Sequence, residues 1–150
     1  MKYYLNVFLI PFLLVIFFTF FSGFSGASDA ILVEELLKER TEIFHKVYFH
    51  EIDPERGEEL LYEIETQPLL ASDIKSLRAF VDTDMDPVKS MQILVLEQIS
   101  GLYGYKSYRS EILWHMKGPE GDYIQSVDYN IVLKRTGSGY KLSEFNAINP

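Results

Sequence analysis

The sequence contains no cysteine in 150 residues. Disulfides and thiolate chemistry are therefore excluded, and the folded part must be stabilised by packing alone. Because no cysteine follows the N-terminal apolar run, lipid attachment of the bacterial lipoprotein kind is excluded too. An Asn-x-Ser/Thr glycosylation site is also absent, which favours a bacterial envelope over a eukaryotic secretory route.

Histidine is scarce, with three residues in the chain. His45 and His50 are five positions apart, so they do not share a helix face, and no His-Glu-x-x-His motif occurs. Ser72 and Lys75 match the Ser-x-x-Lys of penicillin-recognising enzymes, but the companion Ser-Asp-Asn is missing and the chain is too short for that fold. We therefore predict no catalytic residues, no metal site and no cofactor.

Alternate carboxylates at Asp82, Asp84 and Asp86 resemble part of a calcium loop. The helix-loop-helix version of that loop needs Gly at its sixth position and Glu at its twelfth, where this chain has Pro87 and Ile93. We interpret the acids as helix-capping residues, with a weak calcium site as the alternative.

Basic residues are few in the first half of the chain. Residues 28–87 hold 16 acidic and 6 basic side chains, and residues 88–150 hold 6 acidic and 7 basic ones. A nucleic-acid partner requires a basic surface that displaces counterions. We therefore predict no nucleic-acid binding, and we interpret the acidic half as a solvated helical surface.

Residues 5–21 carry no charge and form the one long apolar run, after a positive start at Lys2. The run exceeds the usual apolar core of a signal peptide and is at the low end of a membrane span. Small residues at Ser25 and Ala27 have the spacing of a signal-peptidase site. We predict that residues 1–27 are a signal peptide cleaved after Ala27 or a retained membrane anchor. Either places residues 28–150, a single α+β domain, outside the cytoplasmic membrane.

Helical periodicity follows the leader. Apolar residues recur at helical spacing over residues 30–50 and predict a long amphipathic helix. Asp53-Pro54 marks a second helix that ends at Gln67-Pro68, and Ser72-Asp73 marks the start of a third, with Phe80 facing inward.

Alternating patterns then predict strands. Residues 108–116 and 123–134 alternate, and turn sequences rich in glycine lie between them and after them, so the pattern indicates an antiparallel meander. Residues 88–99 fit both a helix face and a strand. We predict a strand, because a fourth strand covers more of the aromatic face of the sheet.

The order of helices first and a curved antiparallel sheet second resembles the cystatin-like cone of the nuclear-transport-factor-two-like superfamily. The run Gly139-Tyr140-Lys141-Leu142-Ser143-Glu144-Phe145 is similar to the last strand of many such domains. The resemblance implies an α+β fold over about residues 30–148, with N-terminal helices packed on a curved four-stranded antiparallel sheet. The superfamily includes isomerases, dehydratases and non-catalytic envelope modules, so the resemblance does not select a function.

Aromatic residues predicted to face inward suggest a ligand pocket, with core packing as the alternative. These are Tyr105, Tyr108, Trp114, Tyr123, Tyr129 and Tyr140. The candidate ligand-binding residues are Glu97, Tyr108, Trp114 and Tyr129. We predict a non-catalytic extracytoplasmic domain of the bacterial envelope that binds a protein partner or a small apolar ligand, and contacts the membrane through residues 5–21 if these are retained. The alternative is a small lyase or isomerase, in which a pocket carboxylate takes a proton and tyrosines steady the oxyanion.

Overall fold

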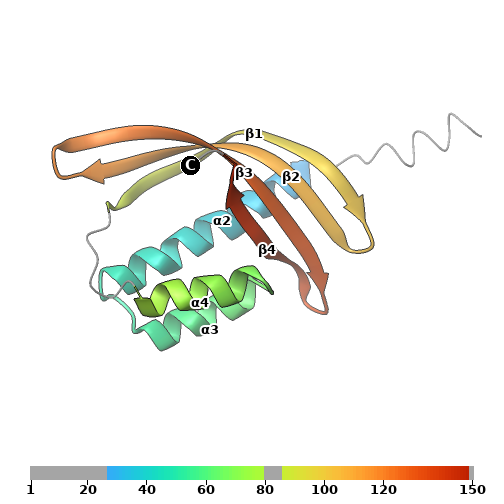
Figure 1. Ribbon diagram of the computed structural model, residues 1–150, viewed down its shortest axis with the longest axis horizontal. Helices are drawn as coiled ribbons and strands as arrows, with labels where there is room; N and C mark the ends of the chain where they lie inside the picture. The colour runs from blue at the N-terminus through green and yellow to red at the C-terminus, as the bar shows by residue number, and fades with distance from the viewer. Residues whose placement is uncertain (1–26, 80–85, 149–150) are drawn as a thin grey trace, which may run out of the picture.

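Three helices precede four strands in the computed structural model, which describes residues 27–79 and 86–148. The elements are α2 (Ala27–Tyr48), α3 (Pro54–Ile64), α4 (Leu69–Ala79), β1 (Val88–Leu102), β2 (Tyr105–Gly118), β3 (Gly121–Thr136) and β4 (Gly139–Ala147). Figure 1 shows a curved sheet that covers one side of the helices. The predicted α+β architecture is confirmed.

The sheet is an antiparallel meander in the order β1-β2-β3-β4. Two-residue turns close the last two hairpins, with Gly118 opposite Gly121 and Thr136 opposite Gly139. Register shifts interrupt the pairing of β1 with β2 and of β3 with β4. Such bulges bend a strand and increase its twist, which explains the curvature around the helices.

Residues 88–99 lie in a strand, as the sequence predicted. Met91, Ile93 and Leu96 of β1 pack against the hydrophobic core, while residues between them are exposed. The register shift between Ile93 and Val95 accounts for the change from odd to even inward positions. The apolar residues of this segment also fit a helix face. As a strand, the segment pairs with β2 along its length, and this pairing satisfies its backbone N–H and C=O groups.

The core lies between the helices and the inner face of the sheet. Its fully buried members come from every layer: Val33, Leu37, Leu61, Leu77, Tyr108, Ile112, Ile131, Leu133 and Leu142. The predicted inward positions of β2 and β3 are confirmed at Tyr108, Ile112 and Ile131, but Tyr105 and Tyr123 are exposed. Tyr123 lies near the end of β3, whereas Tyr105 precedes Lys106, whose side chain reaches Asp29 of α2, so the alternation of β2 places Tyr105 on the outer face of the sheet.

The third helix begins earlier than the sequence indicated. α4 starts at Leu69, directly after Pro68, so Ser72 and Asp73 lie inside the helix. Asp73 is buried and bonded to Arg40, so it is not a capping residue. The pair Ser72-Asp73 is typical of a helix start, so the sequence contained no sign that Asp73 forms a long-range ion pair.

Several predictions concern residues outside the described part. The signal peptide or anchor, Phe80 and most of the acidic loop fall in residues 1–26 and 80–85. Asp86 is described, and its carboxylate accepts a hydrogen bond from the Tyr123 hydroxyl at 2.9 Å. Within residues 27–79 and 86–148 no helix combines the length and the apolar character needed to cross a membrane.

Gly57→Ala is expected to destabilise the domain by about 1 kcal/mol. Gly57 is buried where α3 packs on α2, and a Cβ there would lie 2.5 Å from Cγ2 of Val47. Overpacking of this kind costs about 1–3 kcal/mol, which exceeds the gain of up to about 1 kcal/mol from the better helix propensity of alanine. Thermal unfolding measures the difference, with Glu63→Ala on the exposed side of α3 as the control. A more stable Gly57→Ala variant would show that the two helices can separate at little cost.

Candidate functional site

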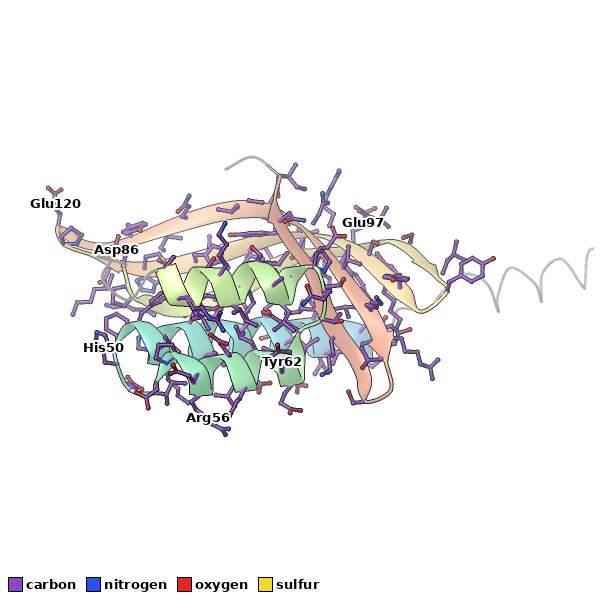
Figure 2. The ribbon with its side chains drawn as sticks, turned by 60° about the horizontal axis from the view of Figure 1, so that its bottom comes forward. His50, Arg56, Tyr62, Asp86, Glu97 and Glu120 are labelled. Atoms are coloured by element: carbon purple, nitrogen blue, oxygen red, sulfur yellow. The ribbon has the colours of Figure 1, made fainter. Side chains whose placement is uncertain are left out.

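A pocket of about 700 Å³ lies between α2, α4 and the inner face of the sheet. Its lining is mostly aromatic and aliphatic: Arg40, Thr41, Phe44, His45, Tyr48, Phe49, Asp73, Ser76, Asp86, Pro87, Val88, Trp114, Met116, Gln125, Val127, Tyr129, Phe145 and Ala147. Figure 2 shows one lining residue, Asp86, at the same end of the molecule as His50, which comes just after α2. The volume and the lining are typical of small-molecule sites.

The sheet side of the pocket is a wall of three aromatic rings, one each from β2, β3 and β4. Tyr129 stacks on Phe145 with ring centroids 4.3 Å apart and an interplanar angle of 9°. Trp114 meets Tyr129 edge to face at 6.2 Å, and its indole N–H donates to the Tyr129 hydroxyl at 3.1 Å. Because adjacent strands place same-face residues side by side, the meander assembles this wall from positions far apart in the sequence.

Opposite this wall, α2, α4 and the C-terminal end of α3 contribute one charged group each to a buried cluster of Arg40, Glu65 and Asp73. The Nε and Nη2 of Arg40 donate to Oδ2 of Asp73 at 2.7 and 2.6 Å. The Nε of Arg40 also lies 3.2 Å from Oε1 of Glu65. The guanidinium packs over the rings of Phe44 and Phe145, at 4.7 and 5.1 Å from their centroids. Arg40 and Asp73 line the pocket, and Glu65 lies behind them.

Glu65 holds a proton at neutral pH. Its side chain is fully buried, and in the described part of the chain neither of its carboxyl oxygens accepts a well-formed hydrogen bond. Burial, helped by the neighbouring Asp73 carboxylate, raises the pKa of Glu65 to about 9, although Arg40 opposes the shift. The protonated carboxyl gains a donor that faces Asp73, which removes the repulsion between the two acids. The cluster then contains one cation and one anion.

Two of the four predicted ligand-binding residues, Trp114 and Tyr129, line the pocket. The other two do not. Tyr108 is buried, and its hydroxyl donates to Asp29 at 2.9 Å. Burial and this hydrogen bond raise the pKa of Tyr108 well above its ordinary value. Burial acts to raise the pKa of Asp29 as well, but hydrogen bonds from Lys106 and Tyr108 outweigh it and bring that pKa below its ordinary value. Tyr108 therefore ties β2 to the start of α2.

Glu97 lies on the opposite side of the sheet from the pocket. Its neighbour Leu96 packs on the core, so the alternation of β1 turns Glu97 outward, and it is exposed opposite Arg109. Figure 2 shows its side chain on the side of the sheet away from the helices. An acid on an apolar strand was therefore a poor indicator of a pocket acid here.

The cluster of Arg40, Glu65 and Asp73 was not predicted from the sequence. Arg40 sits three residues after Leu37 and four before Phe44, which is a position within the apolar stripe of α2. A charge within such a stripe was the available signal for a buried ion pair. Glu65 gave no such signal, because four other acids precede it between residues 55 and 63.

Comparisons with known proteins identify the fold. No protein-family model matches the chain, and no curated protein matches it. The intermembrane-space region of the chloroplast protein ARC6 superposes with a TM-score of 0.51 and 12% identity, over 79% of this chain and 95% of that chain. A protein of Exiguobacterium sibiricum 255-15 is described as a calcium/calmodulin-dependent kinase II association domain. It superposes with a TM-score of 0.50 and 11% identity, over 85% of this chain and 99% of that chain.

The fold is nuclear-transport-factor-two-like. The resemblance drawn from element order and the Gly139–Phe145 run is confirmed at this level. Similarity at 11–12% identity shows the fold and not the function, because proteins with this fold have unrelated functions. The chemistry of the pocket must therefore be read from its own residues.

Proposed function

We propose that the protein is a binding domain on the outer side of the cytoplasmic membrane, exported by a bacterium, whose pocket takes a small uncharged apolar ligand. The observation that carries this proposal is the aromatic pocket of about 700 Å³ between α2 and the sheet. The uncharged run over residues 5–21 supports the location, because a signal peptide and an anchor both direct the C-terminal part of a chain across the membrane.

The pairing of charges in the cluster of Arg40, Glu65 and Asp73 supports an uncharged ligand, and the other carboxylate of the lining, Asp86, accepts a hydrogen bond from Tyr123. The guanidinium of Arg40 is matched by the Asp73 carboxylate, and Glu65 is neutral at pH 7. A charged ligand would have to compete with this internal pair and lose its own hydration on entry. The aromatic rings instead offer apolar contact and stacking, which favour a ligand with a flat or aliphatic body.

Filling the pocket is expected to block the binding of a neutral apolar probe. Val127→Phe adds bulk at a lining position of β3, while Ile124→Phe adds the same ring on the exposed outer side of that strand. We expect N-phenyl-1-naphthylamine to bind the native chain and the Ile124→Phe variant alike. Its affinity for Val127→Phe should fall by about tenfold or more, which corresponds to about 1.4 kcal/mol of lost contact.

Fluorescence titration of the probe measures these affinities, and Trp114, the only tryptophan of the chain, reports from the pocket wall. Equal affinities for the two phenylalanine variants would contradict a ligand site in the pocket. Saturable binding of a folded protein to the outer sheet face, weakened by Ile124→Phe and not by Val127→Phe, would instead support a protein partner.

A lyase or isomerase is the second candidate, and one observation favours it. The pocket wall includes Asp73 beside the proton carried by Glu65, so a carboxylate and a carboxylic acid are adjacent. A carboxylate base in an apolar site can remove a proton next to a carbonyl group. We expect the native chain to exchange the α-protons of α-tetralone for deuterium, and Asp73→Asn to abolish this, if the domain is an enzyme. Exchange at the buffer rate would leave binding as its function.

A further inference from the structure

The turn between β1 and β2 exposes several large apolar side chains close together. We define the hairpin tip as Leu102, Tyr103, Gly104 and Tyr105. Leu102 is 70% exposed and Tyr103 is 98% exposed. Ile99, close to the tip on β1, is exposed as well. Apolar side chains left in this position make no contribution to the core.

Tyr103 is also an unfavourable choice for the turn itself. Both central residues have positive φ, with 52° at Tyr103 and 82° at Gly104. Turns of this kind favour asparagine, aspartate or glycine, because a Cβ with a bulky ring crowds the left-handed backbone. A tyrosine that strains the backbone and is 98% exposed among the described residues is not explained by the packing of the domain, and this indicates a role outside it.

The hairpin tip lies at the same end of the molecule as the start of α2. The Nζ of Lys106 lies 2.7 Å from Oδ2 of Asp29, two residues into α2. Figure 1 shows the β1–β2 turn extending beyond the N-terminal end of α2, and the β2–β3 turn at the opposite end. From Lys106 to Tyr103 is three residues, which span at most about 11 Å.

The length of chain before α2 limits how far this end can lie from the lipid if residues 5–21 stay in the bilayer. Five residues, 22–26, separate the apolar run 5–21 from Ala27. Fully extended, they span at most about 18 Å. If residues 5–21 remain in the bilayer, the start of α2 is held within that distance of the surface. The hairpin tip, which extends past α2, is then within reach of the lipid headgroups.

Charge near the hairpin tip fits an anionic surface. Residues 98–110 contain two basic side chains and no acid, and residues 131–141 contain three basic side chains and no acid. The Nζ of Lys134 lies over the Tyr105 ring at 5.5 Å, and Arg135 donates its backbone N–H to Gly104. Lys106 is paired with Asp29 and Arg109 lies opposite Glu97, so Lys134 and Arg135 supply the positive charge at the tip itself. Basic residues and tyrosine are the residues that anchor proteins at membrane interfaces.

We propose that the hairpin tip inserts into the headgroup region of an anionic lipid bilayer and, together with residues 5–21, fixes the orientation of the domain on the membrane. The occupant of this surface is lipid. The contact depends on retention of residues 5–21 and not on ligand binding in the pocket. It would direct the opposite end of the molecule, with the β2–β3 turn, away from the membrane.

The absence of cysteine makes a clean labelling test available. The full chain is inserted into vesicles of phosphatidylglycerol and phosphatidylcholine as Tyr103→Cys or Glu120→Cys, each labelled with an environment-sensitive nitrobenzoxadiazole dye. Glu120 is exposed in the β2–β3 turn and is the control (Figure 2). We expect the label at 103 to be several-fold brighter than the label at 120 and quenched by headgroup-region nitroxide lipids. The label at 120 should be quenched by aqueous iodide alone.

Equal iodide quenching at both positions would overturn the proposal. So would a chain that does not float with the vesicles, because no anchor would then hold the tip near lipid. A label at 103 that is shielded from iodide but insensitive to nitroxide lipids would assign the surface to a protein contact, such as a second copy. None of these results changes the probe titration of the pocket, so the two proposals fail separately.

Discussion

Arg40→Met is expected to lower the free energy of unfolding by about 3–5 kcal/mol, which for a domain of this size is a fall in melting temperature of roughly 10–20 °C. The side chain of Arg40 is 19% exposed, and that of its main partner Asp73 is 6% exposed. Removing the guanidinium leaves a buried carboxylate with no cation beside a second buried acid, Glu65. An uncompensated buried charge is far more costly than the loss of a surface ion pair.

Lys38→Met is the matched control for this prediction. Lys38 is on the same helix and pairs with Glu34, but both side chains are largely exposed, and such a pair contributes about 0.3–0.5 kcal/mol. The triple variant Arg40→Met, Glu65→Leu, Asp73→Leu should regain most of the lost stability, because it removes the buried acids together with their cation. Chemical denaturation measures all three variants. A loss for Arg40→Met no larger than for Lys38→Met would refute the buried cluster.

Glu65→Gln is expected to make the protein several kcal/mol more stable at pH 8 and about equally stable near pH 4. The pKa of Glu65 is about 9 in the folded protein and near 4.5 when unfolded, so between these values the folded state holds a proton that the unfolded state releases. Stability from this group is therefore fully present below pH 4.5 and is lost as the pH rises toward 9. The slope is about 1.4 kcal/mol per pH unit.

The glutamine amide keeps the shape of the protonated carboxyl and a donor toward Asp73, but it does not titrate. Subtracting the unfolding curve of Glu65→Gln from that of the native chain isolates the contribution of this group from every other titration. Glu63→Gln, exposed on the same helix, should show the native pH dependence. If the difference between native protein and Glu65→Gln were constant from pH 5 to pH 9, Glu65 would not be a buried, protonated acid.

Much of the fold was predictable because it depends on short-range patterns. The period of two in β2 and β3, and the glycines at Gly121 and Gly139, determine strands and turns within a few residues of each position. The candidate site was predictable only in part. Trp114 and Tyr129 follow from the alternation of their strands, whereas Glu97 was placed by residue type alone and lies on the outer side.

The sequence by itself determined the absence of thiol chemistry, the order of helices and strands, and which faces of the strands are aromatic, because each of these depends on composition or on neighbours along the chain. Only the tertiary structure decided which charges meet. Arg40 of α2 and Asp73 of α4 are 33 residues apart, and Glu65 joins them from the C-terminal end of α3. Ionisation depends on burial and on the distance to other charges, and both exist only after three helices have packed against a curved sheet.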